Sequence, residues 1–376
     1  MKSSSSSVEF TTLGVKHHSM FGMLFPMSSF LLILQELEKI ESLVDYKNTS
    51  KHLSQRISFS ISSKINSKQK IEQIIDIINQ LGFGTFEIKI ISRNKIVISH
   101  KKYISTIFQT VYSIKPSYIC EKIMFHFIMN CLEEVLEMKI LNFEILCTNS
   151  HLNLVCSDFS KKSTNTFSSH SHCYGDVQML EYSNLSNPII VKIKQERQLV
   201  IKNGVLSLWK TSGIFIPFEI LNNLFKLIDS QNSRALEIIA QLQLYSAVQL
   251  QKNVFGIKDN EQIFSVLLLQ TILIGIGEAQ VISKTNSKIK IRLNSQLFED
   301  SKNTNTICLE LEKFCIFILK GIIEFGLDVQ TTFIKSESQS NIYYTFKIEH
   351  FGRELQEEEI ELSKKLSANI QINKFV

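Results

Sequence analysis

The sequence predicts an α+β protein of two similar domains, each a block of helices with a small antiparallel sheet. A short stretch that begins with glycine and ends with proline occurs twice, at Gly22–Pro26 and Gly213–Pro217. A glycine-x-glycine step also occurs twice, at Gly82–Gly84 and Gly275–Gly277. After each step, a strand pair, a long apolar helix and a second strand pair are expected. This repeated order predicts an internal duplication, with the two halves related by a pseudo-twofold axis as in a dimer.

The expected domain boundaries follow changes in composition along the chain. A polar, disordered tail comes first, and a linker rich in Ser, Thr, Asn, Lys and His separates the two domains. An amphipathic, charged helix is expected at the C-terminus. The predicted segments are a tail at 1–19, a first domain at 20–160, a linker at 161–188, a second domain at 189–352 and a C-terminal helix at 353–376.

Composition limits the classes of function. The 376 residues suit two domains, and 44% hydrophobic residues indicate a folded chain. The net charge of +5 is spread thinly, so no nucleic-acid contact is expected. The apolar runs Met20–Leu34 and Phe264–Ile276 are too short and too interrupted for a transmembrane segment. Seven cysteines without regular spacing and no visible leader indicate a cytoplasmic protein with free or metal-bound thiols.

Three helices are expected at the start of the first domain. Apolar residues spaced by three and four indicate them at Ser28–Leu43, Thr49–Ile65 and Lys68–Leu81. Ser28 or Ser29 is expected to cap the first helix, because a hydroxyl there accepts from free amides of the first turn. Gly82 is expected to end the third helix.

The rest of the first domain alternates strands with one long helix. The apolar period changes to two at Phe86–Ile91, and a turn at Arg93-Asn94 leads to a second strand at Lys95–Ser99. The long helix is expected at Ser117–Met138. A hairpin should then follow, formed by Ile140–Thr148 and Leu152–Phe159.

The second domain is expected to repeat this order after three short strands. Those strands are expected at Ile189–Ile193, Gln198–Ile201 and Val205–Trp209, with a hairpin turn at Asn203-Gly204. Helical patterns follow at Phe218–Ser230, Arg234–Lys252, Asn260–Ile274 and Thr306–Phe325. Strands are expected at Ala279–Ser283, Ile289–Leu293, Asp328–Ser336 and Asn341–His350.

The glycine step, the helix that opens at Cys120 and the pattern Glu144-x-x-Cys147 followed by Cys156 resemble the 4-vinyl reductase domain. The resemblance covers about 20–159 and 205–350. It implies the ligand-binding fold shared by nitric-oxide signalling and Golgi transport proteins, including Bet-type subunits of the transport protein particle (TRAPP). Members of the family include sensor domains of bacterial transcription activators, archaeal proteins of unknown role and a protein tied to bacteriochlorophyll vinyl reduction.

The resemblance implies a structural zinc site at Cys120, Glu144, Cys147 and Cys156, because sensor members hold zinc with this order of residues. Thiolates and a carboxylate suit tetrahedral zinc. If the hairpin turns about residues 151–152, Cys147 and Cys156 oppose each other across the ladder. Against this, Glu144 and Cys147 would point to opposite faces of a regular strand. The alternative is that the cysteines are buried core residues without a metal.

An apolar site beside each long helix is the second candidate, because small-molecule sites are concave and mostly apolar. Its expected lining residues are Ile123, His126, Phe127, Phe314, Phe317 and Ile318. The alternative for His126 is a histidine satisfied at a packing interface. Bulky residues stand where the family's helices carry glycines and would fill space that a ligand or a neighbouring helix uses; these are Phe125, Met129, Lys313 and Phe317.

Three functions follow as hypotheses. The first is a non-enzymatic sensor or regulatory tandem domain that binds a small hydrophobic ligand and protein partners. The second is a TRAPP-like structural interaction module with a packed interior. The third, a tetrapyrrole vinyl-reductase-related role, rests on the family name, since no Walker loop, Ser/His/Asp set or catalytic carboxylate pair is evident. An internal pseudo-dimer is expected, and a monomer is one option for its assembly.

Overall fold

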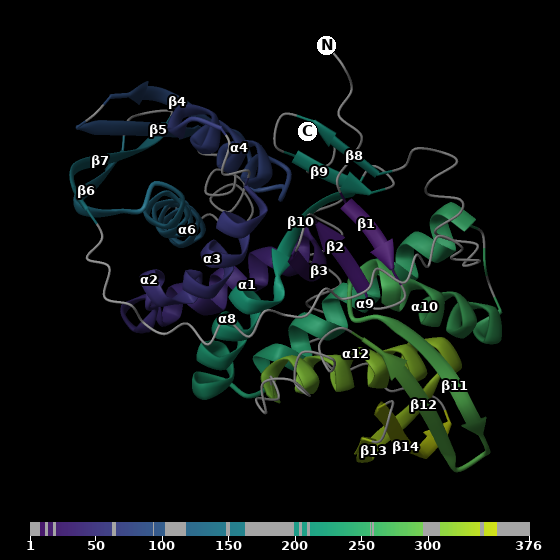
Figure 1. Ribbon diagram of the computed structural model, residues 1–376. Helices are drawn as coiled ribbons and strands as arrows, with labels where there is room; N and C mark the ends of the chain where they lie inside the picture. The colour runs from purple at the N-terminus through teal and green to yellow at the C-terminus, as the bar shows by residue number, and fades with distance from the viewer. Residues whose placement is uncertain are drawn as a thin grey trace.

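The computed structural model describes residues 8–11, 14–17, 20–61, 65–92, 94–101, 118–147, 151–161, 199–202, 205–208, 211–255, 257, 259–295, 309–338 and 342–351. It is a mixed α+β structure with one six-stranded and two four-stranded antiparallel sheets (Figure 1). Within these ranges no helix has the length and apolarity needed to cross a membrane. The expected C-terminal helix, the strand expected at 189–193 and residues 162–188 of the expected linker lie outside the described residues.

The six-stranded sheet joins the two halves of the chain. Its strand order is β1-β2-β3-β10-β9-β8. These strands span Val8–Thr11 (β1), Gly14–His17 (β2), Met20–Pro26 (β3), Thr211–Pro217 (β10), Val205–Leu208 (β9) and Leu199–Lys202 (β8). At its centre β3 and β10 run antiparallel, with Pro26 opposite Gly213 and Gly22 opposite Pro217. The two glycine-to-proline stretches found in the sequence are therefore each other's partners.

The expected disordered tail over 1–19 is wrong for two of its segments. Residues 8–11 and 14–17 form β1 and β2, which pair with each other, and β2 pairs with β3. The alternation of Val8 and Phe10 with Glu9 and Thr11 was the available signal, and the polar residues before it masked this short pattern.

The glycine steps fit against the opposite half of the chain. Gly82 has φ +94°, and a Cβ there would lie 2.7 Å from the carbonyl oxygen of Gly213. Gly275 has φ +103°, and its Cβ would collide with the carbonyl oxygen of Gly22. The amide of Phe215 also donates to the carbonyl of Leu81 at 2.8 Å. Each glycine step thus allows close backbone contact with the glycine-to-proline strand of the other half.

The two smaller sheets have the same strand order. The sheet of the first half is ordered β4-β5-β7-β6 and that of the second half β11-β12-β14-β13. The first contains Phe86–Ile91 (β4), Lys95–Lys101 (β5), Met138–Cys147 (β6) and His151–Lys161 (β7). The second contains Glu278–Lys284 (β11), Lys288–Asn294 (β12), Val329–Ser338 (β13) and Ile342–Phe351 (β14).

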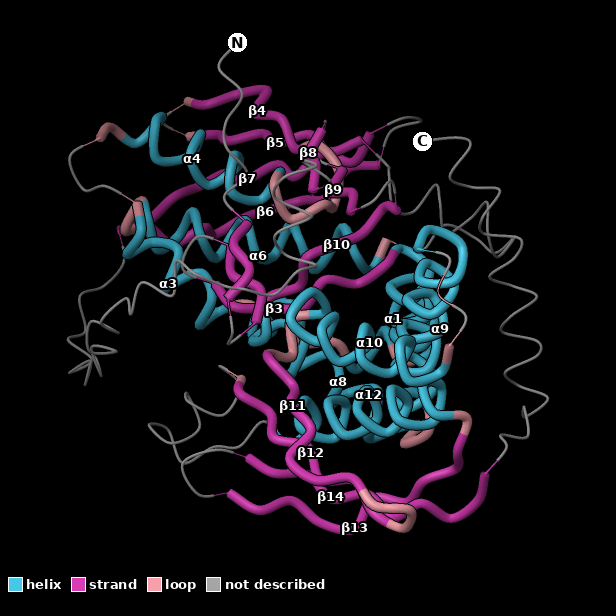
Figure 2. Tube along the Cα trace, turned by 90° about the vertical axis from the view of Figure 1, so that its right-hand side faces the viewer, coloured by secondary structure: helices cyan, strands magenta, loops and turns pink. Residues whose placement is uncertain are grey.

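Helices fill the space between the sheets. In the first half these are Met27–Lys39 (α1), a 3₁₀ turn at Glu41–Leu43 (η1), Tyr46–Thr49 (α2), Lys51–Ser60 (α3), Ser67–Asn79 (α4) and Ile119–Val135 (α6). In the second half they are Phe218–Gln231 (α8), Ala235–Phe255 (α9), Asn260–Ile274 (α10) and Leu309–Leu327 (α12). Figure 2 shows α6 near the first small sheet and α12 beside the second, with α1, α8, α9 and α10 between them.

Local signals explain where several helices begin and end. The expected serine cap of α1 is wrong: Pro26 is the N-cap and no side chain caps the helix. Pro26 itself has extended backbone, with φ −55° and ψ 145°, and the helix begins at the next residue. Asn66 and Gln69 form a capping box at α4, which the sequence analysis did not identify. Gly275 ends α10 in the left-handed conformation.

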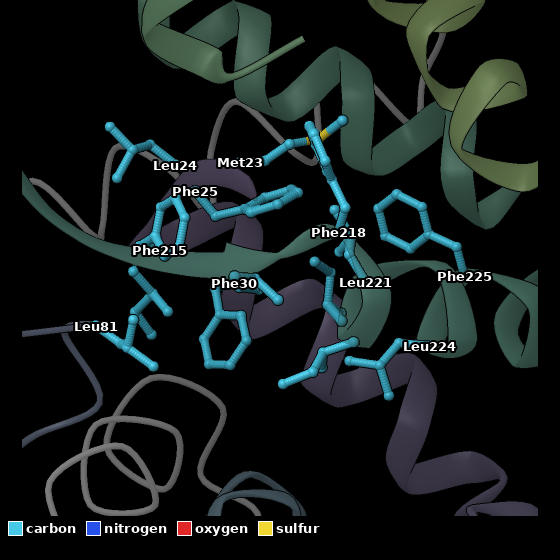
Figure 3. Packing of buried hydrophobic residues seen from close by; sticks show 14 of the residues in the cluster. Met23, Leu24, Phe25, Phe30, Leu81, Phe215, Phe218, Leu221, Leu224 and Phe225 are labelled. Atoms are coloured by element: carbon cyan, nitrogen blue, oxygen red, sulfur yellow. The ribbon is translucent and has the colours of Figure 1, made fainter. Parts of the chain in front are cut away.

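The core is continuous across the two halves. Phe25, Phe215 and Phe225 are each 0% exposed and come from β3, β10 and α8. Figure 3 shows Phe25 and Phe215 on the central strands, with Leu81 of the first half beneath Phe215, and the Phe225 ring, to the right, is 6.4 Å from that of Phe25. Burying aromatic side chains contributes several kilocalories per mole in total. The junction between the halves is therefore part of the main core.

Candidate functional site

The hairpin register separates the expected zinc ligands. Cys147 lies opposite Leu152, whereas Cys156 lies opposite Phe143. The expected pairing of Cys147 with Cys156 is wrong, because the strands are connected through residues 148–150 and not by a turn about 151–152. Leu152 and Cys156 are four residues apart, which is about 13 Å along a strand.

The four expected ligands also differ in burial. Cys120 on α6 is 3% exposed and Cys156 on β7 is 0% exposed, while Glu144 and Cys147 are exposed. The Sγ atom of Cys147 lies 3.7 Å from the Tyr118 hydroxyl. Burial raises the pKa of Cys156 to about 12, so this thiol is protonated at neutral pH. Within the described ranges, His, Cys, Asp and Glu form no group of three that could hold a metal ion.

The expected ligand-lining residues of α6 have different neighbours. Ile123 is 5% and Phe127 0% exposed, so both belong to the packed core. His126 is half-buried and lies at the corner of α2, α6 and β6. Its ring stacks on Tyr46 with centroids 5.4 Å apart and meets the edge of Phe143 at 5.3 Å.

The pKa of His126 is lowered mainly by its burial. The cations Lys47 and Lys122 lower it further, and the Asp45 carboxylate opposes them. Lys122 forms an ion pair with Glu41, which also accepts a 3.2 Å hydrogen bond from the Tyr46 hydroxyl. The Nδ1 atom of His126 is buried and has no hydrogen-bond partner in the described structure. His126 was expected to line a ligand site, and its ring contacts in the structure are with Tyr46 and Phe143.

In the second half, the protein's own side chains occupy the expected ligand positions. Phe314 is 0% exposed and its ring lies 6.0 Å from Phe25 and 4.7 Å from Phe225. Ile318 is 0% exposed and Phe317 is half-buried. Phe314 and Ile318 were expected to line an apolar ligand site, and both belong to the packed core.

The family's glycine positions are likewise used for packing. Phe125 is 0% exposed and meets Phe86 edge-to-face at 5.9 Å. Lys313 forms a 2.5 Å ion pair with Asp229 of α8. Gly321 of α12 lies against Leu244 of α9, so a neighbouring helix uses the space that this glycine leaves.

His100 was not identified from the sequence. It is 1% exposed on β5, and its Nε2 atom is 2.9 Å from the carbonyl oxygen of Phe83, within the first glycine step. Its ring stacks on Phe86 at 4.1 Å. Burial lowers the pKa of His100 to about 4, so the ring is neutral and its Nε2–H donates to Phe83. The position of His100 in the alternating strand β5 could have indicated a buried histidine.

The edge of the first small sheet was also missed. β6 is the terminal strand in the sheet order, and within the described ranges only β7 pairs with it. Three of its large apolar residues are exposed: Leu141 (53%), Phe143 (41%) and Leu146 (47%). Near its start, the amide of Ile140 donates to Glu133 Oε1 at 2.9 Å. A long apolar edge strand is a template for pairing with another chain.

The 4-vinyl reductase resemblance rests on the residues quoted above and stays a prediction. The structure offers three features that bear on function: the packed interior, the aromatic corner at His126 and the β6 edge. Comparison with family models, curated proteins and solved structures found no match to this chain.

Proposed function

We propose that the protein is a non-enzymatic interaction module, of the kind that TRAPP-like subunits represent, built as an internal pseudo-dimer. Two features support the duplication. Glu133 and Glu324 each accept, at 2.9 Å, the amide of an early residue in the strand after the long helix. Glu137 and Asp328 each have φ +54° at the helix-to-strand turn. The matching strand orders and the β3–β10 register support it further.

The packing of the long helices favours an interaction module over a ligand sensor. A ligand pocket beside α6 or α12 needs apolar walls that face an open space. Here Phe127, Phe314 and Ile318 are 0% exposed and pack within the core. Binding through the outer surface is then the function that this interior leaves available.

The observation that carries the proposal is the β6 edge. In the part of the chain that the structure describes, β6 is a ten-residue terminal strand with no second neighbour, and its residues Leu141, Phe143 and Leu146 are exposed. Partners bind such edges by adding a strand, with backbone hydrogen bonds giving affinity and side chains giving specificity. Glu133 occupies the amide of Ile140, which leaves the strand beyond it as the binding segment.

An assembly measurement tests this function without knowledge of the partner. The tagged full chain is passed through size exclusion directly from an extract of the cells that express it. We expect it to elute above the 43.2 kDa of a single chain. The double variant Leu141→Lys with Leu146→Lys should move to the single-chain position, because charges at an apolar edge oppose pairing.

The matched control is Ile282→Lys on β11, since Ile282 is 48% exposed on the other small sheet. It should retain the larger assembly. A wild-type chain that elutes at 43.2 kDa contradicts the proposal.

One observation favours a small apolar ligand as a second candidate. The unpaired Nδ1 atom of His126 lies beside Phe143, which is 41% exposed. A ligand with one hydrogen-bond donor and an apolar body would satisfy both groups. Native mass spectrometry of the purified chain should then show an adduct of constant mass that His126→Leu loses. The bare chain mass in both samples would remove this candidate.

A further inference from the structure

The outer face of the second small sheet is basic. Its central strands β12 and β14 pair without a register shift, so their side chains alternate between the two faces. Ile289, Ile291 and Leu293 are at most 1% exposed and belong to the core, on the side where Figure 2 shows α12. The alternate residues of β12 and their partners on β14 point the other way; these are Lys288, Lys290, Arg292, Tyr343, Thr345 and Lys347. This set contains four cations and no carboxylate.

Neighbouring carboxylates neutralise part of this charge. Glu337 on β13 forms ion pairs with Lys290 and Lys335, and hydrogen bonds from these two lysines lower the pKa of Glu337 to about 2. Glu349 forms a 2.9 Å ion pair with Lys347. Both carboxylates are therefore charged at neutral pH and already engaged by lysines.

Within the described residues, two cations of this face have no carboxylate partner. Lys288 is exposed and forms no ion pair there. The Arg292 guanidinium donates to the amide oxygen of Gln280, which is neutral. When β11 is included, where Glu278 shares this face, five cations stand against three carboxylates. Positive charge therefore remains for an acidic partner.

The first small sheet carries no charge at the corresponding central positions. Counted from the two glycine steps, Lys290 and Arg292 of β12 correspond to Val97 and Ser99 of β5. A sheet with this strand order therefore forms without cations at these positions. The basic face is a property of the second half and not a requirement of the fold.

The chain continues from this sheet into an acidic segment. β14 ends at Phe351, and residues 354–361 contain five glutamates and neither lysine nor arginine. We propose that the outer face of the second small sheet binds residues 354–361 of the same chain, through ion pairs between these glutamates and the cations around Lys288 and Arg292. This contact is separate from the β6 edge, which belongs to the other small sheet.

The position of Phe351 allows this contact. Lys347 lies opposite Lys288 and four residues before Phe351, which is about 13 Å along the strand. Three to ten residues separate Phe351 from the glutamates of the segment, enough for about 10–34 Å of extended chain. The segment can therefore turn back over the basic face. Because so short a tether gives a local concentration in the millimolar range, surface ion pairs that are individually weak suffice to hold it.

Carbodiimide coupling tests the contact, because this reagent joins a carboxylate to a lysine amine only where the two groups touch. The purified full chain is treated at low concentration and low ionic strength, and the linked peptides are mapped. We expect links from 354–361 to Lys288, Lys290 and Lys347 in material of single-chain mass. At about 1 M salt, where the screening length is about 3 Å, these links should decrease several-fold.

A charge reversal on the sheet separates binding from mere proximity along the chain. In Lys288→Glu with Arg292→Glu, coupling of the segment to Lys347 should fall several-fold. The matched control is Lys89→Glu with Lys95→Glu, which makes the same change in charge at exposed residues of the first small sheet. This control should leave the coupling unchanged.

A second reversal, in the segment itself, should restore the contact. When Glu357→Lys, Glu358→Lys and Glu359→Lys are added to the sheet variant, new links should join the carboxylates at positions 288 and 292 to amines at 357–359. This rescue shows that the reversed sheet is still folded. Coupling to Lys347 that survives the sheet reversal unchanged, absence of the rescue, or links found only between two chains would overturn the proposal.

Discussion

His100 makes the stability of the protein depend on pH in a direction that the structure fixes. Its pKa is about 4 in the fold, against an ordinary value of 6.5, because burial disfavours the charged ring. The unfolded chain therefore binds more protons than the folded chain between these values. Stability from this group is fully present above pH 6.5 and is lost as the pH falls towards 4.

The magnitude follows from the shift. The two pKa values differ by about 2.5 units, which corresponds to about 3 kcal/mol at roughly 1.4 kcal/mol per unit. The side chain is 1% exposed, so solvent screening is small. Because single domains are stable by about 5–15 kcal/mol, this is a substantial fraction of the total.

Urea unfolding of wild type and His100→Gln, at steps from pH 7.5 to 4, isolates this effect. The glutamine amide can still donate to the Phe83 carbonyl but does not titrate in this range. Other groups, including His126 and buried carboxylates, titrate equally in both proteins and cancel in the difference. We expect wild type to lose about 3 kcal/mol more than the variant. Parallel pH profiles would show that His100 is not buried as a neutral ring.

Three further predictions concern packing and thiol reactivity. Gly82→Ala should lower the melting temperature, because its φ is +94° and its Cβ would press on Gly213; an unchanged melting curve would contradict the crossed contact. Phe314→Ala should cost about 3–5 kcal/mol in urea unfolding, and a cost below 1 kcal/mol would show that this ring is not central to the core. Iodoacetamide should modify exposed Cys147 in the native protein within minutes, whereas buried Cys156 should react only after unfolding, as peptide mapping will report. Equal native rates for the two thiols would contradict the hairpin register.

Elements with a strong period were predictable. The isoleucines of α4 all lie on one face, and Ile71, Ile74 and Ile78 are at most 1% exposed. The strand pair at Phe86–Ile91 and Lys95–Lys101 also forms, although an irregularity between Ile88 and Ile90 interrupts the expected alternation and leaves Ile90 44% exposed. Such elements are predictable because local burial imposes the period on the sequence.

Features that depend on register or distant contact were less accessible. The connection through 148–150 shifts Cys147 away from Cys156, and composition holds no direct record of such a shift. The repeat at Gly22–Pro26 and Gly213–Pro217 was identified from the sequence, but neither copy contains a pattern that predicts pairing between the two strands. The buried apolar positions of α6 were predicted from their spacing. The residues that pack against them could not be predicted, because tertiary packing determines them.

The crossed contact between the halves has a consequence for synthesis on the ribosome. β3 is made about 190 residues before β10, so at 5–20 residues per second its central partner follows roughly 10–40 s later. Throughout this interval Met23 and Phe25, both 0% exposed in the finished protein, have no β10 to cover them. The nascent first half must therefore wait with an open, apolar strand edge, which is a substrate for chaperones and a site for premature association.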